Sequence, residues 1–309
     1  MKSEDSIMSL LDPAAYERAI ANFPAGAQEK LRGFSDHKNF CGVVTAADAL
    51  YIAAQTGWDM RQVMLGLLDV ARLYARPPIS KFRVGAVAQG LSGNLYYGAN
   101  LEFVGEALSL TVHAEQSATA NAWTHGERGL QSLAISAAPC GHCRQFLYEL
   151  TTASTLRIFL PDRPPTMLTD LLPDAFEPRD LGAQGGLMRE ENHQLLLPSD
   201  DPVALAALSA ANMSYAPYSK GYAGVALLTP DGQIYSGPYA ENVAFNPSIS
   251  PMEAALARLN MCGRMYQDIS QAALVEAQGS PCSQVDVTRN LLRSVSQVEL
   301  AVIYARKPS

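Results

Sequence analysis

The spacing of apolar and polar residues predicts a regular order of helices and strands in the middle of the chain. Apolar residues at three-to-four spacing predict a helix from about 58 to 75, which Arg76-Pro77-Pro78 ends. Alternation over 81–90 and a second apolar run over 94–100, joined by a Ser92-Gly93 turn, predict a β-hairpin. Two more helix–strand pairs follow, with helices over 117–126 and 140–152 and strands over 132–138 and 156–160. This order predicts an α/β domain, a layered mixed sheet flanked by helices.

The segments around this block have a different character. Residues 1–57 predict a small helical N-terminal segment, in which Pro13 suits the first turn of one helix and Thr45 precedes another. Residues 161–198 are rich in Pro and Gly, which is typical of a connector that runs over the surface. We therefore expect one domain at 58–180, a linker at 181–197 and another domain at 198–309.

The second half of the chain repeats the first. PYSKGYAGVALLTPDGQIYSGPYAEN mirrors PISKFRVGAVAQGLSGNLYYGANLEF, with Ser219-Lys220 at the place of Ser80-Lys81, about 139 residues earlier. Gly224 and Gly237 likewise repeat two glycines of the first hairpin. A single repeat at this distance indicates duplication of a domain rather than a solenoid.

Four residues of the first copy have the spacing of a catalytic metal site. His113 and Glu115 form a His-x-Glu, and Cys140 and Cys143 follow in a Pro-Cys-x-x-Cys at the start of a helix. Residues three apart on a helix can face one point, and a helix N-terminus favours the thiolate form. Two thiolates and one imidazole suit zinc and leave a fourth position open for water, which zinc makes acidic. Glu115 is close enough to a ligand to take the proton of that water.

A purely structural zinc site is the alternative, and it needs a fourth protein ligand. His142 lies inside the Cys-x-x-Cys turn and is expected to point away, at the surface or beside the ligands. The pair His37 and Cys41 has ligand spacing but no third ligand nearby, so we interpret it as structural. The candidates for a fourth ligand are therefore weak, and they are His142, Cys41, His37 and His125.

The second copy is expected to lack the metal site. With a one-residue gap, Glu253 falls at the place of Glu115, and Pro251, which has no ligand atom, falls at the place of His113. Pro281-Cys282 resembles the Pro-Cys of the first copy, but Val285 stands where the second cysteine would be. One zinc ion per chain is the expectation.

Composition and charge narrow the class of protein. The 309 residues are 48% hydrophobic and 17% charged, an ordinary globular composition. The net charge of −7 argues against a long nucleic acid as substrate. Five cysteines at these spacings make a disulfide framework improbable and favour a reducing compartment. Because the start MKSEDSIMSLL resembles no secretory signal and no apolar run nears 18 residues, we expect a cytoplasmic protein without a membrane partner.

The pattern H-x-E…P-C-x-x-C is that of the zinc nucleobase deaminases. Beyond this pattern, the chain closely resembles the long, two-domain, dimeric type of cytidine deaminase. The stretches that carry the resemblance are TVHAEQSA, PCGHCRQF, NLEF, LPDAF, SYAPYSK and AENVAFNP. It covers nearly the whole chain and weakens only in the first 45 or so residues. It implies hydrolytic deamination of cytidine and deoxycytidine, with a zinc cofactor and a homodimer of one active and one degenerate copy per chain.

The resemblance also implies roles for particular residues. His113, Cys140 and Cys143 would bind zinc, and Glu115 would be the general acid and base. The substrate would be held by residues of the hairpin and of the His-x-Glu segment, namely Phe82, Asn100, Leu101, Glu102 and Ala114. The second copy would help form the dimer and close the partner's site, with Phe176, Ala244 and Phe245 as lid or partner-subunit contacts.

Phe82 could instead be a core residue of its strand, and Asn100 and Glu102 could simply cap a turn. A carboxylate at Glu102 that faces the 3′-hydroxyl would repel a phosphate and favour a nucleoside. Two other functions stay open. They are a cytosine deaminase that acts on polynucleotides and a non-catalytic zinc-binding interaction module.

Overall fold

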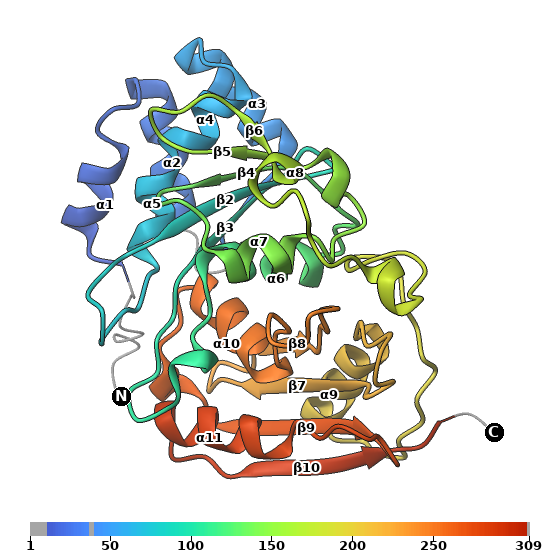
Figure 1. Cartoon of the computed structure of the whole chain (residues 1–309). Helices are drawn as coiled ribbons and strands as arrows, with labels where there is room; N and C mark the ends of the chain where they lie inside the picture. The colour runs from blue at the N-terminus through green and yellow to red at the C-terminus, as the bar shows by residue number, and fades with distance from the viewer. Residues whose placement is uncertain (1–10, 37–39, 308–309) are drawn as a thin grey trace, which may run out of the picture.

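The computed structural model describes residues 11–36 and 40–307, and its elements follow the repeated order that the sequence predicts (Figure 1). The first copy comprises α4 (Met60–Gly66), α5 (Leu68–Leu73), β2 (Gly85–Gly90), β3 (Leu95–Ala99), α6 (Ala114–Thr124), β4 (Leu130–Ile135), α7 (Gly141–Leu147) and β5 (Arg157–Phe159). The second copy comprises α9 (Pro202–Met213), β7 (Ala223–Leu228), β8 (Ile234–Pro238), α10 (Pro251–Met261), β9 (Gln271–Ala277), α11 (Val285–Val295) and β10 (Leu300–Ala305).

The remaining elements lie before the two copies, between them, or in loops within them. The N-terminal segment contains α1 (Pro13–Ile20), α2 (Ala25–Asp36), β1 (Val43–Val44) and α3 (Ala46–Thr56). The connector contains β6 (Thr166–Met167), α8 (Leu168–Leu171) and the 3₁₀ turn η3 (Pro178–Leu181). Three more 3₁₀ turns are η1 (Leu108–Leu110), η2 (Ala153–Thr155) and η4 (Tyr266–Asp268). Asp12 and Thr45 accept backbone N–H groups at the starts of α1 and α3, as expected of N-caps.

Two mixed sheets have the same internal topology. The first runs β1-β3-β2-β4-β5-β6 and the second β10-β9-β7-β8, so that β3-β2-β4-β5 corresponds to β8-β7-β9-β10. In each sheet only the last of these pairings, β4 with β5 and β9 with β10, is parallel, and the hairpins are antiparallel. The duplicated α/β architecture is thus confirmed, and β1 of the N-terminal segment joins the edge of the first sheet at β3.

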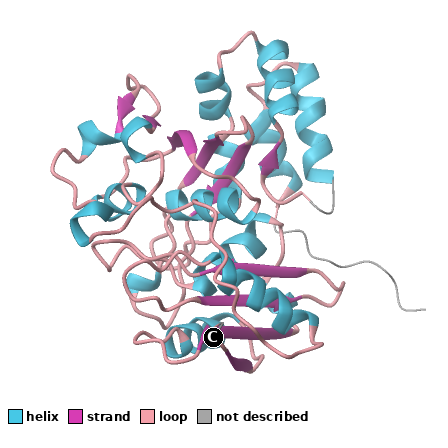
Figure 2. Cartoon of the chain, turned by 90° about the vertical axis from the view of Figure 1, so that its right-hand side faces the viewer, coloured by secondary structure: helices cyan, strands magenta, loops and turns pink. Residues whose placement is uncertain are grey.

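The two sheets face each other across a shared helical layer (Figures 1 and 2). Alternation along β2 explains this: Ala86 and Ala88 belong to a core shared with α6 and α10, whereas Val87 belongs to a core formed with the N-terminal helices. A third core lies between the second sheet and α9. The helix that carries His113 and Glu115 therefore packs directly against its counterpart in the second copy.

Glycines on β3 and β8 let α6 and α10 approach their sheets and also fix the alignment of the two copies. A Cβ at Gly98 would lie 2.4 Å from the carbonyl oxygen of Ala114, and a Cβ at Gly237 would lie 2.4 Å from that of Pro251. Pro251 therefore corresponds to Ala114, with an offset of 137 residues.

The predicted alignment of the two helices was wrong by one residue. His113 is the N-cap of α6 and Ser250 the N-cap of α10, so Ser250, not Pro251, stands in the place of His113. Met252 then stands in the place of Glu115, and Glu253 corresponds to Gln116. The cause is a two-residue shortening between the Glu102 region and the helix, in a loop that carries no periodic signal.

The likeness of Pro281-Cys282 to Pro139-Cys140 also does not hold in space. Cys140 is the N-cap of α7, whereas the N-cap of α11 is Gln284, two residues beyond Cys282. Other differences are local. The helix predicted from 58 to 75 is interrupted at Leu67, where Gly66 packs against the rings of Trp58 and Phe23.

One disulfide contradicts the expectation drawn from the cysteine count. Cys41, just before β1, is bonded to Cys262, the C-cap of α10, across a separation of 221 residues. It ties the N-terminal segment to the second copy. Cys140, Cys143 and Cys282 are free. In the part of the chain that the structure describes, no helix has the length and apolar character needed to cross a bilayer.

Candidate zinc site and active site

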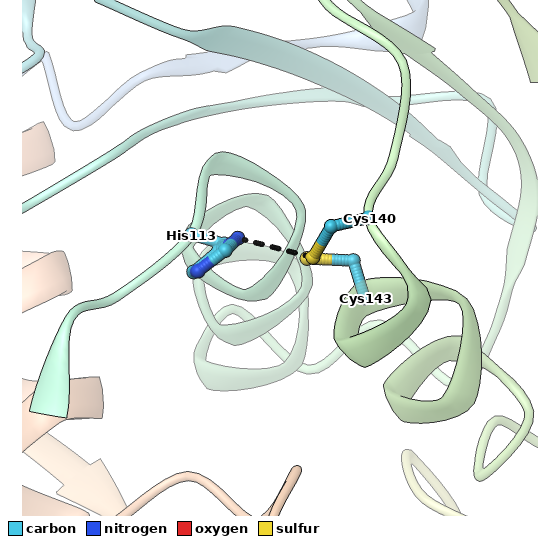
Figure 3. Close-up of side chains that lie close together, drawn as sticks. All are labelled: His113, Cys140 and Cys143. Atoms are coloured by element: carbon cyan, nitrogen blue, oxygen red, sulfur yellow. Dashed lines mark hydrogen bonds between the residues drawn. The ribbon is translucent and has the colours of Figure 1, made fainter. Parts of the chain in front are cut away.

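Three side chains converge where the N-termini of α6 and α7 meet (Figure 3). The ligand atoms of His113, Cys140 and Cys143 all lie within 4.8 Å of one another, and Cys140 Sγ is 3.7 Å from His113 Nδ1. Zn–S and Zn–N bonds of ordinary length in a tetrahedron place sulfur and nitrogen about 3.6 Å apart. The donor set and its spacing therefore fit a zinc ion bound through Nδ1 of the histidine.

The surroundings of Cys140 favour its thiolate. The thiol of Cys143 and the backbone N–H groups of Cys143 and His142 point toward its sulfur and, despite partial burial, lower the pKa of Cys140 to about 4. The same contact with Cys140, together with burial, raises the pKa of Cys143. The pair thus loses its first proton readily, which is the property of a soft-metal ligand at a helix N-terminus.

Glu115 lies in the first turn of α6, buried beside the three ligands. Burial raises the pKa of this carboxyl, against the lowering effects of its own backbone N–H and of the nearby His113 ring. The carboxyl also reaches the thiol of Cys143. A carboxyl with a raised pKa at the edge of a metal site is suited to accept a proton and give it back.

A cavity of about 280 Å³ opens in front of these residues. His113, Glu115 and Cys140 belong to its wall, as do Asn100 and Glu102. The sequence pattern did not point to several other wall residues. The full lining is Ser80, Phe82, Val84, Asn100, Glu102, Thr111, His113, Ala114, Glu115, Ala137, Ala138 and Cys140.

Asn100 and Glu102 shape the loop at 79–84, of which residues 81–84 were predicted to begin a strand. Asn100 accepts a hydrogen bond from Val84 N and donates one to Phe82 O, so its amide takes the place of a neighbouring strand. The loop stays irregular up to Gly85, where β2 begins. As a result Phe82 is not a core residue: it is 61% exposed and lines the cavity.

Glu102 accepts hydrogen bonds from Ile79 N at 2.8 Å, Ser80 N at 2.9 Å and Ser80 Oγ. Partial burial raises the pKa of Glu102, but these bonds outweigh it and lower the pKa overall, so the side chain is a carboxylate. Glu241 holds Tyr218 N, Ser219 N and Ser219 Oγ in the same way in the second copy. Because this set of three hydrogen bonds to one carboxylate persists in the copy that lacks the metal ligands, holding the loop is one function of Glu102.

Comparison with known proteins agrees with this geometry. The family model described as "Cytidine and deoxycytidylate deaminase zinc-binding region" matches residues 59–157, and a second model of the same description matches 168–289. A cytidine deaminase of Cronobacter sakazakii is 43% identical over 93% of this chain and 98% of its own length. One of Yersinia pestis is 44% identical over 91% of this chain and 96% of its own.

The chain belongs to the cytidine deaminase family. Among solved structures, a cytidine deaminase from Mycobacterium tuberculosis aligns at 37% identity with a TM-score of 0.35, over 37% of this chain and 95% of that one. Each half of the chain matches a deaminase family model by sequence. Within the described residues, however, the His/Cys/Cys group occurs in the first copy alone.

Leu101, which was expected to bind the substrate, does not line the cavity, and neither do the three residues expected as lid or partner-subunit contacts. The Leu101 side chain is buried in the core, and its backbone pairs with Arg76 and Val112. Among the described residues, Phe176, Ala244 and Phe245 do not line the cavity of their own chain. Phe176 and Phe245 are 41% and 64% exposed.

The candidates for a fourth zinc ligand are also accounted for. Cys41 is in the disulfide, and the His125 ring contacts Asn121 O. His142 stacks on His113 with ring centroids 5.5 Å apart, beside the ligands rather than among them. His37 lies outside the described residues. Within the described chain, the group has three protein ligands, which fits a catalytic rather than a structural zinc site of this cytidine deaminase.

Proposed function

We propose that this protein hydrolyses cytidine and 2′-deoxycytidine to uridine and 2′-deoxyuridine with release of ammonia. The C4–N bond to the amino group breaks, and a C4–O bond to the oxygen of water forms. The observation that carries the proposal is the three-ligand group beside the buried Glu115 at the wall of a cavity of about 280 Å³. We infer the substrate from the related proteins, which are named cytidine deaminases.

His113, Cys140 and Cys143 would hold the zinc ion, one per chain. When bound, zinc supplies a Lewis acid that brings the pKa of a water molecule toward neutrality. Glu115 then moves protons: it takes one from the attacking water, delivers it to N3 of the pyrimidine, and passes a second to the departing amino group. Its burial at the cavity wall suits this exchange, because the raised pKa of Glu115 eases return of the proton.

The rest of the cavity would bind the nucleoside. Asn100 and Glu102 line the cavity and would bind the ribose hydroxyls, and the exposed ring of Phe82 would pack against the pyrimidine. Ala114, at the first turn of α6, would contact the base through its backbone. The Glu102 carboxylate would repel a 3′-phosphate, which favours a nucleoside over a polynucleotide.

A substrate panel tests this assignment. Turnover is measured side by side on cytidine, deoxycytidine, cytosine, deoxycytidylate and a single-stranded oligonucleotide. We expect the two nucleosides to be deaminated far faster than the other three. Preferred turnover of the oligonucleotide, with strong dependence on salt, would favour the polynucleotide deaminase instead. No turnover on any of them would favour the zinc-binding interaction module.

We further propose a homodimer in which the second copy, at about 198–309, completes the site of the partner. The exposed aromatic rings of Phe176 and Phe245 support this, because apolar groups of this size are commonly covered by a partner. Ala244 and Phe245 would contact the partner's substrate. For the other parts of the chain we propose residues 1–57 as the N-terminal segment, 58–180 as the catalytic domain and 181–197 as the linker.

Subunit complementation tests the shared site. A Glu115→Ala chain and a Phe245→Ala chain are mixed, unfolded and refolded together. If Phe245 serves the partner, the mixed dimer contains one site with an intact Glu115 and an intact Phe245, and activity is recovered. Mixtures no more active than the average of the two variants, or a monomeric full-length chain, would contradict the proposal.

We also propose a cytoplasmic location, because a reducing compartment keeps the exposed Cys140 available to the metal. The Cys41–Cys262 disulfide points the other way, since such bonds are uncommon in the cytoplasm. Trapping thiols in intact cells before lysis distinguishes the two. A cytoplasmic enzyme is expected to give reduced Cys41 and Cys262, and a fully oxidised pair would contradict the location.

A further inference from the structure

One buried side chain next to the zinc ligands is used by neither the metal nor the substrate cavity. Gln116 is the third residue of α6 and is almost fully buried. Its Oε1 accepts a hydrogen bond from His113 N at 3.1 Å. Its Nε2 donates to Pro247 O at 3.4 Å and lies 3.3 Å from Nε2 of His142. A single amide therefore joins a zinc ligand, the residue stacked on that ligand, and the second copy.

The partners determine the orientation of this amide. The backbone N–H of His113 can only donate and the carbonyl of Pro247 can only accept, so oxygen faces the first and nitrogen the second. The nitrogen must then also donate to His142, which therefore presents a lone pair at Nε2. Gln116 thus fixes the ring of His142, and this ring lies against His113 at an angle of 27°.

The loop at 242–247 of the second copy makes three such contacts: one to α6 through Pro247, one to α7, and one to Glu149, two residues beyond the end of α7. Asn242 donates to the carbonyl of Gln145 on α7 at 3.1 Å, and Val243 N donates to the buried carboxylate of Glu149 at 2.8 Å. The loop of the second copy is thereby held against both α6 and α7. Of these contacts, only that of Gln116 reaches a metal ligand directly.

We propose that Gln116 is a positioning residue for the zinc site, which it links to the degenerate copy through Pro247. It holds the backbone at the ligand His113 and the ring of His142 in register with the second copy. This inference rests on the proposed function only for its kinetic readout, since the metal site itself can be measured without turnover. Partners that orient ligands in this way commonly contribute ~10–100-fold to metal affinity or activity.

The chain contains its own control. Glu253, at the equivalent place in the second copy, accepts a hydrogen bond from Ser250 N at 2.6 Å and so makes the same bond to its N-cap. Gln116→Glu therefore keeps an acceptor for His113 N but loses the donors to Pro247 and His142. Glu253→Gln makes the reverse change in the second copy, where the described residues hold no metal group. A Gln116→Met variant removes both functions without adding charge.

The experiment compares the three variants with wild type, each loaded with zinc or with cobalt. We expect Gln116→Glu and Gln116→Met to lower kcat by ~10–100-fold with KM within about threefold, to shift the visible bands of the cobalt protein and to release zinc faster to a chelator. Glu253→Gln is expected to leave the kinetic constants, the cobalt bands and the rate of zinc release unchanged. Cobalt spectra and zinc release equal to wild type in both Gln116 variants would overturn the inference, even if activity fell.

A double-variant cycle tests the link between Gln116 and His142 separately. His142→Leu removes the acceptor together with the ring that stacks on His113, and in combination with Gln116→Met we expect less than the product of the two single effects on zinc release. Strictly multiplicative effects would overturn the link between these residues. If wild type binds zinc but does not deaminate cytidine, the proposed function fails, while the cobalt and zinc-release measurements still decide the role of Gln116.

Discussion

Glu253→Gln should stabilise the protein at alkaline pH and leave its stability nearly unchanged at acidic pH. Glu253 lies buried at the start of α10, and although Ser250 donates hydrogen bonds to it, burial dominates and raises the pKa from 4.5 to about 7. In the unfolded chain the carboxyl loses its proton near pH 4.5, whereas in the folded chain it keeps the proton until about pH 7. Stability therefore falls as the pH rises through this window.

The magnitude follows from the shift in pKa. A difference of about 2.5 units, at about 1.4 kcal/mol per unit, makes ionised Glu253 cost about 3 kcal/mol above pH 7. Glutamine keeps an oxygen for Ser250 N but carries no charge, as Gln116 does in the first copy. The variant is therefore expected to gain up to about 3 kcal/mol in unfolding free energy at pH 8 and close to none at pH 4.

Urea unfolding of both proteins at a series of pH values measures this difference. Taking variant minus wild type at each pH cancels the contribution of the zinc thiolates, which titrate in both. The difference should rise between pH 4.5 and 7 and level off above that range. A difference that does not change with pH, or a variant less stable than wild type at pH 8, would refute the reasoning.

Three further predictions concern other contacts. In protein purified in air without reductant, then denatured and freed of zinc, three thiols should react with a thiol reagent and five after reduction, because Cys41 and Cys262 are paired. Five reactive thiols in both conditions would contradict the disulfide. Glu102→Ala removes the charge-assisted hydrogen bonds to Ile79 N, to Ser80 N and, as proposed, to the ribose 3′-hydroxyl, and should lower kcat/KM by about 10–100-fold. The variant enzyme should have similar kcat/KM values for cytidine and its 3′-deoxy analogue. Glu149→Leu removes the acceptor of three donors of the second copy, of which Tyr215 and Val243 are buried, and should lower the unfolding free energy by about 3 kcal/mol, seen as an earlier urea midpoint.

Local pattern was enough to predict the element order and the members of the metal group. Each half of the group lies within four residues on a helix start, so spacing alone brings its atoms together. The hairpin glycines were equally informative, because close approach of a helix demands glycine in both copies.

What the sequence could not supply depends on contacts between distant segments. The Cys41–Cys262 bond joins residues 221 positions apart, and no spacing rule pairs them. The alignment of α10 with α6 depends on loop length, so a two-residue deletion moved Met252 to the place of Glu115. Residues 81–84 were predicted as strand because their alternation fits one, but the Asn100 side chain takes up the hydrogen bonds of Phe82 and Val84. Gln116 belongs to a motif, yet its link to Pro247 appears only when the second copy is folded against the first.

The central claim is that a zinc site with three protein ligands and Glu115 deaminates cytidine. The most direct test follows the ultraviolet absorbance of cytidine with wild type and Glu115→Gln, with zinc content measured in both preparations. We predict one zinc per chain in each protein and a rate at least ~10²-fold lower in the variant, because the proton carrier is lost and the metal ligands remain. Equal rates in the two proteins, at equal zinc content, would contradict the account.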